Sequence, residues 1–118
     1  MFNGLLLKES LSDERVLNLI KIIKTEIWHP KNATDFQPKT WTAIYFQGEE
    51  NKVDQLVDKF SKTLKARWYL NIKVGDTIYV IYPKKVFKYP SGNKLKRVEA
   101  IIYGQKEGIP DSQLDWNE

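Results

Sequence analysis

Residues 67–82 constrain the fold more than any other part of this chain. From Arg67 to Val74 an apolar side chain stands at every second position, which is the spacing of a β-strand with one buried face. Gly75-Asp76 is typical of a two-residue hairpin turn, and Thr77–Tyr82 is rich in residues that favour strands. We therefore predict a β-hairpin over these residues.

The turn also predicts the register of the hairpin. A two-residue turn fixes four cross-strand pairs: Leu70 with Ile81, Ile72 with Tyr79, Tyr69 with Tyr82, and Lys73 with Ile78. Pro83-Lys84-Lys85 indicates a second tight turn into a strand over Val86–Tyr89, which would place Lys88 opposite Val80. The result is a three-strand meander with a core face and an open face.

Two earlier segments have the apolar spacing of amphipathic helices. The first follows Ser12 as a possible N-cap and ends at Pro30, and its apolar residues are Val16, Leu19, Ile20, Ile23 and Ile27. The second follows Asn51, with Val53, Leu56, Val57, Phe60 and Leu64 on one side. Gly4–Glu9 and Trp41–Gln47, which precede them, are predicted strands.

The segment 94–107 fits both a strand and a helix. Leu95, Val98 and Ile102 have helical spacing, and Gly108 followed by Ile109-Pro110 is a typical helix end, so we favour a helix. At 118 residues the chain suits one domain, 1–118. The order of elements predicts an α+β fold. We expect a two-layer sandwich, ferredoxin-like or related, in which two amphipathic helices lie on a mostly antiparallel sheet that ends in the meander and a C-terminal helix.

Charge is distributed unevenly along the chain. Residues 62–97 carry ten basic side chains and only Asp76 as an acid, whereas residues 98–118 carry five acids and one base. A basic block can attract nucleic acid or an acidic partner, or it can be a solvated face that the acidic tail offsets. The chain has no cysteine, which suits a reducing cytoplasm, and no apolar run long enough for a membrane span.

Three segments carry a resemblance to known sequences: QPKTWTAIYF at 37–46, VFKYPSGNK at 86–94 and YGQKEGIPDSQLDW at 103–116. They resemble a family of small uncharacterised bacterial proteins that end in a similar GIP-x-SQLDW run. The resemblance spans most of the chain and implies a bacterial or archaeal cytoplasmic source. It implies no activity and assigns no functional residue.

Catalytic and metal-binding patterns are sparse. The six glycines form neither a phosphate loop nor a dinucleotide fingerprint, and one histidine without cysteine is a poor basis for zinc. His29 with Asp35 nearby could serve in acid–base catalysis, although a histidine at a helix end is the simpler interpretation. We expect no cofactor and no metal, and a small enzyme using His29 is the third of three hypotheses.

The open face of the meander carries the other two hypotheses. Its candidate binding residues are Arg67, Tyr69, Lys73, Tyr82 and Lys88, a mixture of cations and rings that suits single-stranded nucleic acid. The same face also holds Ile78, Val80 and Val86, so either the C-terminal helix or a second copy of the chain should cover it. The first hypothesis is a small cytoplasmic interaction module that self-associates as a homodimer, and the second is a nucleic-acid-binding protein using 62–97.

Overall fold

The computed structural model describes residues 1–118 and contains one antiparallel sheet with strand order β2-β3-β1-β4-β5-β6. The strands are β1 (Phe2–Leu7), β2 (Lys21–Trp28), β3 (Trp41–Gly48), β4 (Leu70–Val74), β5 (Thr77–Tyr82) and β6 (Lys85–Pro90). The helices are α1 (Val53–Thr63) and α2 (Lys94–Lys106), with short 3₁₀ turns at Lys8–Ser10, Glu14–Leu19, Glu50–Lys52 and Asp111–Gln113. The fold is α+β, and neither α-helix is long and apolar enough to cross a membrane.

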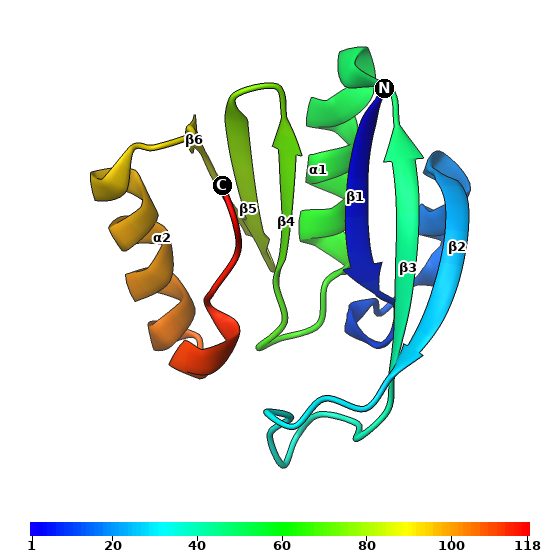
Figure 1. Ribbon diagram of the computed structural model, residues 1–118, viewed down its shortest axis with the longest axis vertical. Coiled ribbons are helices and arrows are strands. Elements are labelled where there is room, and N and C mark those ends of the chain that lie inside the picture. The colour runs from blue at the N-terminus through cyan, green and yellow to red at the C-terminus, as the bar shows by residue number, and fades with distance from the viewer.

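The two helices lie on opposite faces of the sheet. Alternate residues of β5 enter two separate apolar cores: Tyr79 and Ile81 pack with the α1 side, and Ile78, Val80 and Tyr82 pack with the α2 side. Figure 1 shows α1 behind the sheet, and α2 with the red C-terminal segment beside β4–β6. The expected two-layer, ferredoxin-like arrangement is therefore not confirmed.

The hairpin is confirmed in its turn and its register. Leu70 pairs with Ile81, Ile72 with Tyr79 and Lys73 with Ile78, and the rings of Tyr69 and Tyr82 lie 5.7 Å apart between centroids. Gly75 has φ +58°, a conformation that glycine adopts without strain. Strand β4 begins at Leu70 rather than at Arg67.

The predicted register of the third meander strand is wrong by one residue. Tyr82 pairs with Lys85, so the turn contains only Pro83 and Lys84, and Lys84 takes φ +65°. As a result Phe87 faces Val80, while Lys88 pairs with Tyr79 and lies on the α1 side. Lys88 is 3.6 Å from the Asp54 carboxylate of α1.

The first predicted helix is also wrong. Residues 14–19 form a 3₁₀ turn capped by Asp13 rather than by Ser12, and Lys21–Trp28 is a strand paired with β3. β-branched residues dominate this strand, and they favour the extended conformation over the helix. The second predicted helix is confirmed as α1, although it begins at Val53 and follows a 3₁₀ turn instead of a cap at Asn51.

The helix at 94–107 is confirmed as α2, but it packs through an unexpected face. Leu95, Val98 and Ile102 are exposed, whereas Ala100 and Gly104 are buried against the sheet. A Cβ atom at Gly104 would lie 2.7 Å from the Tyr82 hydroxyl and 2.7 Å from a Leu114 methyl. The smallest residue therefore stands where the helix comes closest to its neighbours.

This close approach predicts that Gly104→Ala destabilises the protein. Alanine gains up to about 1 kcal/mol in helix propensity, but overpacking a tight core costs about 1–3 kcal/mol. We expect a net loss of about 1 kcal/mol in the free energy of unfolding by urea. Ile102→Ala on the exposed side of α2 is the control and should change little, and the reverse order of effects would contradict this packing.

Candidate functional site

The largest cavity is an open groove of about 640 Å³ on the face of the sheet opposite α1. It follows the seam between β1 and β4, where only Gly4 and Ile72 are register partners. Its lining includes Leu5 and Leu7 of β1 and Leu70 of β4. Because α2 covers only the β4–β6 part of this face, the groove lies beside the uncovered β1–β3 part.

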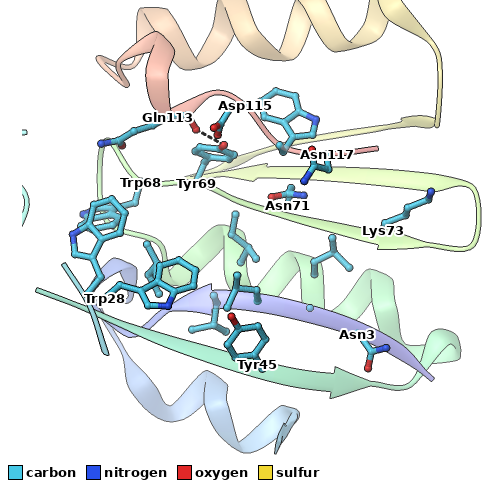
Figure 2. A pocket seen from close by; sticks show the side chains of 18 of the residues that line it. Asn3, Trp28, Tyr45, Trp68, Tyr69, Asn71, Lys73, Gln113, Asp115 and Asn117 are labelled. Atoms are coloured by element: carbon cyan, nitrogen blue, oxygen red, sulfur yellow. Dashed lines mark hydrogen bonds between the residues drawn. The ribbon is translucent and has the colours of Figure 1, made fainter. Parts of the chain in front are cut away.

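Aromatic residues gather in this groove. All four tryptophans of the chain are among its lining residues: Trp28, Trp41, Trp68 and Trp116. Trp41 and Trp68 pack edge to face with ring centroids 5.6 Å apart, and Figure 2 shows Trp28 and Trp68 at one end of the groove. The half-buried rings of Trp28, Tyr45 and Tyr69 are the ones that a ligand could contact most fully.

The walls of the groove supply polar groups. Asn71, Gln113, Asp115 and Asn117 line one wall, and Asn3 lies toward the end opposite the tryptophans (Figure 2). These side chains offer both hydrogen-bond donors and acceptors. Pockets of this size with apolar walls and a few polar groups are typical of ligand sites.

Three of the five predicted binding residues lie in this groove. Arg67, Tyr69 and Lys73 line it, and Lys73 stands at the end away from Trp28 (Figure 2). Tyr82 does not line the groove: its side chain is fully buried, and its hydroxyl donates to Ala100 O at 2.7 Å. Lys88 is exposed but lies on the α1 side because of the register shift, so the structure does not bring it together with the other three.

Tyr69 is held firmly in the wall. Its hydroxyl donates to the backbone oxygen of Gln113, and its ring packs against Tyr82 and Trp116. Burial, together with the nearby negative charge of Asp115, raises the pKa of Tyr69. The hydroxyl therefore stays protonated and serves as a fixed donor to the C-terminal segment.

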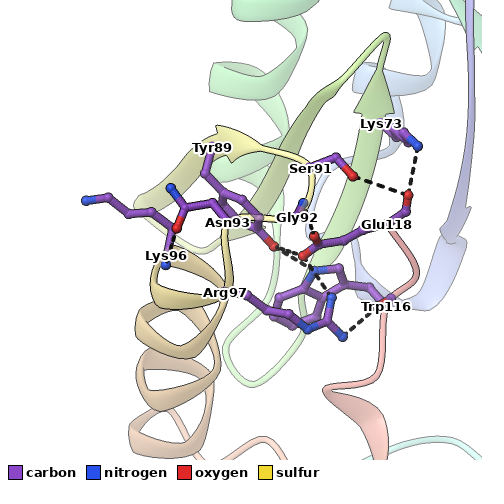
Figure 3. A network of polar contacts seen from close by, with 9 residues as sticks. All are labelled: Lys73, Tyr89, Ser91, Gly92, Asn93, Lys96, Arg97, Trp116 and Glu118. Atoms are coloured by element: carbon purple, nitrogen blue, oxygen red, sulfur yellow. Dashed lines mark hydrogen bonds and ion pairs between the residues drawn. The ribbon is translucent and has the colours of Figure 1, made fainter.

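The C-terminal segment forms one wall of the groove, and a polar network holds its end in place (Figure 3). The Glu118 carboxylate accepts hydrogen bonds from the Tyr89 hydroxyl at 2.7 Å, Arg97 at 2.9 Å and Gly92 N at 3.0 Å. Burial alone would raise the pKa of Glu118, but these bonds outweigh it and lower the pKa to about 2. Arg97 also donates to Trp116 O at 2.8 Å.

A second contact joins this segment to the loop at 30–40. The side-chain amides of Gln37 and Gln113 bond to each other at 2.8 and 3.1 Å, and Gln113 also donates to Asn32 O at 2.7 Å. Gln37 is buried, and a buried glutamine needs hydrogen-bond partners. Gln113 supplies them. Asn32 of this loop also lines the groove.

Ion pairs neutralise part of the basic block. Four of its ten basic side chains have carboxylate partners: Lys62 with Asp58, Lys88 with Asp54, Lys96 with Glu99, and Arg97 with Glu118. Two of these partners, Glu99 and Glu118, belong to the acidic stretch 98–118, and the other two lie in α1. Arg67 and Lys73 have no carboxylate partner, although Arg67 lies over the Phe36 ring at 4.9 Å and Lys73 donates to Glu118 O at 2.7 Å.

His29 follows strand β2 and is exposed. It therefore does not end a helix, as the simpler sequence interpretation had it, and no hydrogen bond or ion pair joins it to Asp35. The structure contains no group of three or more histidine, cysteine, aspartate or glutamate side chains placed to hold a metal ion.

The sequence interpretation missed Trp28 and Tyr45 as site residues. Trp28 was assigned to a helix that does not exist, so its place on the strand beside Trp41 was hidden. The signal available was the content of β-branched residues, Ile22, Ile23, Thr25 and Ile27, which favours a strand. Asp115 and Asn117 reach the groove through the fold of the tail, which no local pattern predicts.

No protein-family model, curated protein or solved structure matches this chain.

Proposed function

We propose that this protein is a small cytoplasmic binding module that acts through the groove, and that its ligand is a short single strand of nucleic acid. The observation that carries the proposal is that the half-buried rings of Trp28 and Tyr45 line one groove with Arg67 and Lys73. The other three tryptophans also line the groove, but they are buried and form its walls. Single-strand binders combine rings on which bases stack with cations that contact phosphates. The groove supplies both.

Its polar groups suit the edges of bases. Amide side chains can donate to and accept from the same base, and Asn71 and Asn117 stand along one wall. The rings of Trp28 and Tyr45 are half-buried, and the Lys24 ammonium lies over the Tyr45 ring at 4.5 Å. A base on Tyr45 would therefore have a cation beside it.

The shape of the groove favours an extended ligand over a compact one. Arg67 lies in the turn before β4, with φ +69°, and Lys73 lies near the far end of that strand, so the strand from Leu70 to Lys73 alone separates them by about 10 Å. The single phosphate of a mononucleotide cannot contact both cations, whereas successive phosphates of a single strand can. An extended peptide has a similar length but lacks the phosphates that would use these cations.

The test is a titration followed by intrinsic tryptophan fluorescence, because all four tryptophans lie at the proposed site. The probes are a single-stranded oligothymidylate of roughly ten nucleotides, a duplex of the same length, and a mononucleotide. We expect quenching by the single strand alone at low salt. Two phosphate contacts predict a slope of about −1.4 in log affinity against log salt, since each contributes about −0.7.

Variants of the two cations sharpen the test. Arg67→Ala and Lys73→Ala should each lower affinity and reduce the salt slope by about 0.7. Lys84→Ala is the matched control, because Lys84 is an exposed cation of the same block that does not line the groove. The proposal is wrong if no oligonucleotide binds at low salt, or if Lys84→Ala weakens binding as much as the groove variants do.

A further inference from the structure

Strand β2 is an edge of the sheet, and its outer side has no partner strand. Soluble proteins usually protect such edges with lysine, proline or short strands, because unpaired backbone groups attract other strands. The opposite edge, β6, is protected in this way by Lys85, Lys88 and Pro90. Strand β2 also has two lysines, Lys21 and Lys24, but it has eight residues and no proline.

Apolar side chains are exposed on this edge. Ile22 is 46% exposed, Ile23 51% and Ile27 59%, and the neighbouring Leu19 is 57% exposed. These four large aliphatic side chains lie close together in the sequence, and in a monomer their apolar surface is exposed to solvent. Neither helix covers them.

The sequence of β2 is complementary to itself. If two copies pair antiparallel with Thr25 on the twofold axis, Lys24 lies opposite Glu26. In a twofold interface this pair occurs twice, with Ile27 beside it. The pairing of β2 with β3 is regular from Lys24 to Trp28, beyond the irregularity between Ile22 and Lys24, so the central residues keep strand geometry.

Neighbouring registers lack this complementarity. With Lys24 on the axis two lysines face each other and Ile22 faces Glu26. With Glu26 on the axis two glutamates face each other and Lys24 faces Trp28. Like charges directly opposite each other destabilise a strand pair, so the Thr25 register is favoured over both.

We propose that the partner of β2 is a second copy of this chain, paired antiparallel about Thr25 so that the two sheets become continuous. Backbone hydrogen bonds and the isoleucines supply the association, and Lys24 and Glu26 select the register. This interface differs from the open face of the meander on which the sequence placed self-association, because α2 and the C-terminal segment cover that face. Lys24 and Glu26 also adjoin the groove through Tyr45 and Trp28, so the test below measures association of the free chain, without oligonucleotide.

The test is sedimentation velocity on the full chain across micromolar concentrations. We expect a dimer that Lys24→Glu or Glu26→Lys weakens about tenfold or more, because both symmetric pairs then change from attraction to repulsion. The double variant Lys24→Glu/Glu26→Lys restores opposite charges and should recover the dimer. Circular dichroism identifies variants that retain the fold.

Lys96→Glu on α2 is the matched control. Lys96 lies 3.5 Å from Glu99, the same distance as between Lys24 and Glu26, and the exposures of the two pairs are similar. This variant should leave the dimer unchanged. The proposal is overturned if the wild type is a monomer at every concentration, if the double variant fails to recover association, or if Val98→Lys on the exposed side of α2 is what disrupts it.

Discussion

Tyr82→Ala is expected to reduce the free energy of unfolding by about 3–5 kcal/mol, the range seen when a large aromatic side chain is removed from a core. The Tyr82 side chain is fully buried between β5 and α2. Its ring centroid lies 5.0 Å from that of Tyr103 and 6.0 Å from that of Phe87. The truncation removes these contacts and leaves a cavity that Gly104 is too small to fill.

Urea unfolding measures this loss, and Tyr82→Phe is the control. Phenylalanine keeps the ring and removes only the hydroxyl bond to Ala100 O, which should cost about 1 kcal/mol. A loss well below 2 kcal/mol for the alanine variant would mean that α2 does not pack on the meander. The face of the β4–β6 meander on which α2 packs would then again be a candidate binding surface.

Trp116→Ala is expected to release the C-terminal segment from the sheet. Trp116 is 5% exposed, donates to the Tyr89 hydroxyl at 2.9 Å, and packs against Tyr69 and Arg97. Removing a buried tryptophan costs about 3–5 kcal/mol when the structure cannot adjust. Here the segment can detach while the rest of the protein stays folded, because it is joined covalently to the rest only at the end of α2. The lost stability should therefore appear mainly as local opening of this segment.

Hydrogen exchange separates local opening from global unfolding. We expect faster exchange over residues 109–118 and unchanged exchange in β1 and β3, with loss of single-strand binding because the groove loses a wall. Ser112→Ala, at an exposed position of the same segment, should alter neither exchange nor binding. Uniformly faster exchange in Trp116→Ala, including β1 and β3, would contradict a separately anchored tail.

Local patterns predicted the elements whose determinants are local. The turn and the register of the hairpin were predictable because Gly75-Asp76 fixes the turn and alternation fixes the faces, whereas the start of β4 at Leu70 was not. Helix α1 was predictable because its apolar side is continuous over three turns. The two-residue turn at Pro83-Lys84 was not predictable, because Lys84 adopts a left-handed conformation that is more typical of glycine or asparagine.

Tertiary contacts decided the remainder. The isoleucines of β2 fit a helical stripe equally well, and pairing with β3 made the segment a strand. The buried side of α2 is marked by Ala100 and Gly104 rather than by its larger residues, because close approach to Tyr82 requires small side chains. Of the site, Arg67, Tyr69 and Lys73 could be predicted from the hairpin, whereas the tryptophans converge only in three dimensions.

The most direct test of the groove as the binding site is a two-dimensional amide NMR titration with single-stranded oligothymidylate at low salt. The four indole N–H signals report on the groove separately from the backbone. We expect shifts confined to the groove, at Trp28 of β2, Tyr45 of β3, strands β1 and β4 and the C-terminal segment. The Trp28 indole should be among the most shifted because it is the least buried of the four tryptophans. Shifts centred on Lys88 and α1, or no shifts at saturating oligonucleotide, would contradict the account.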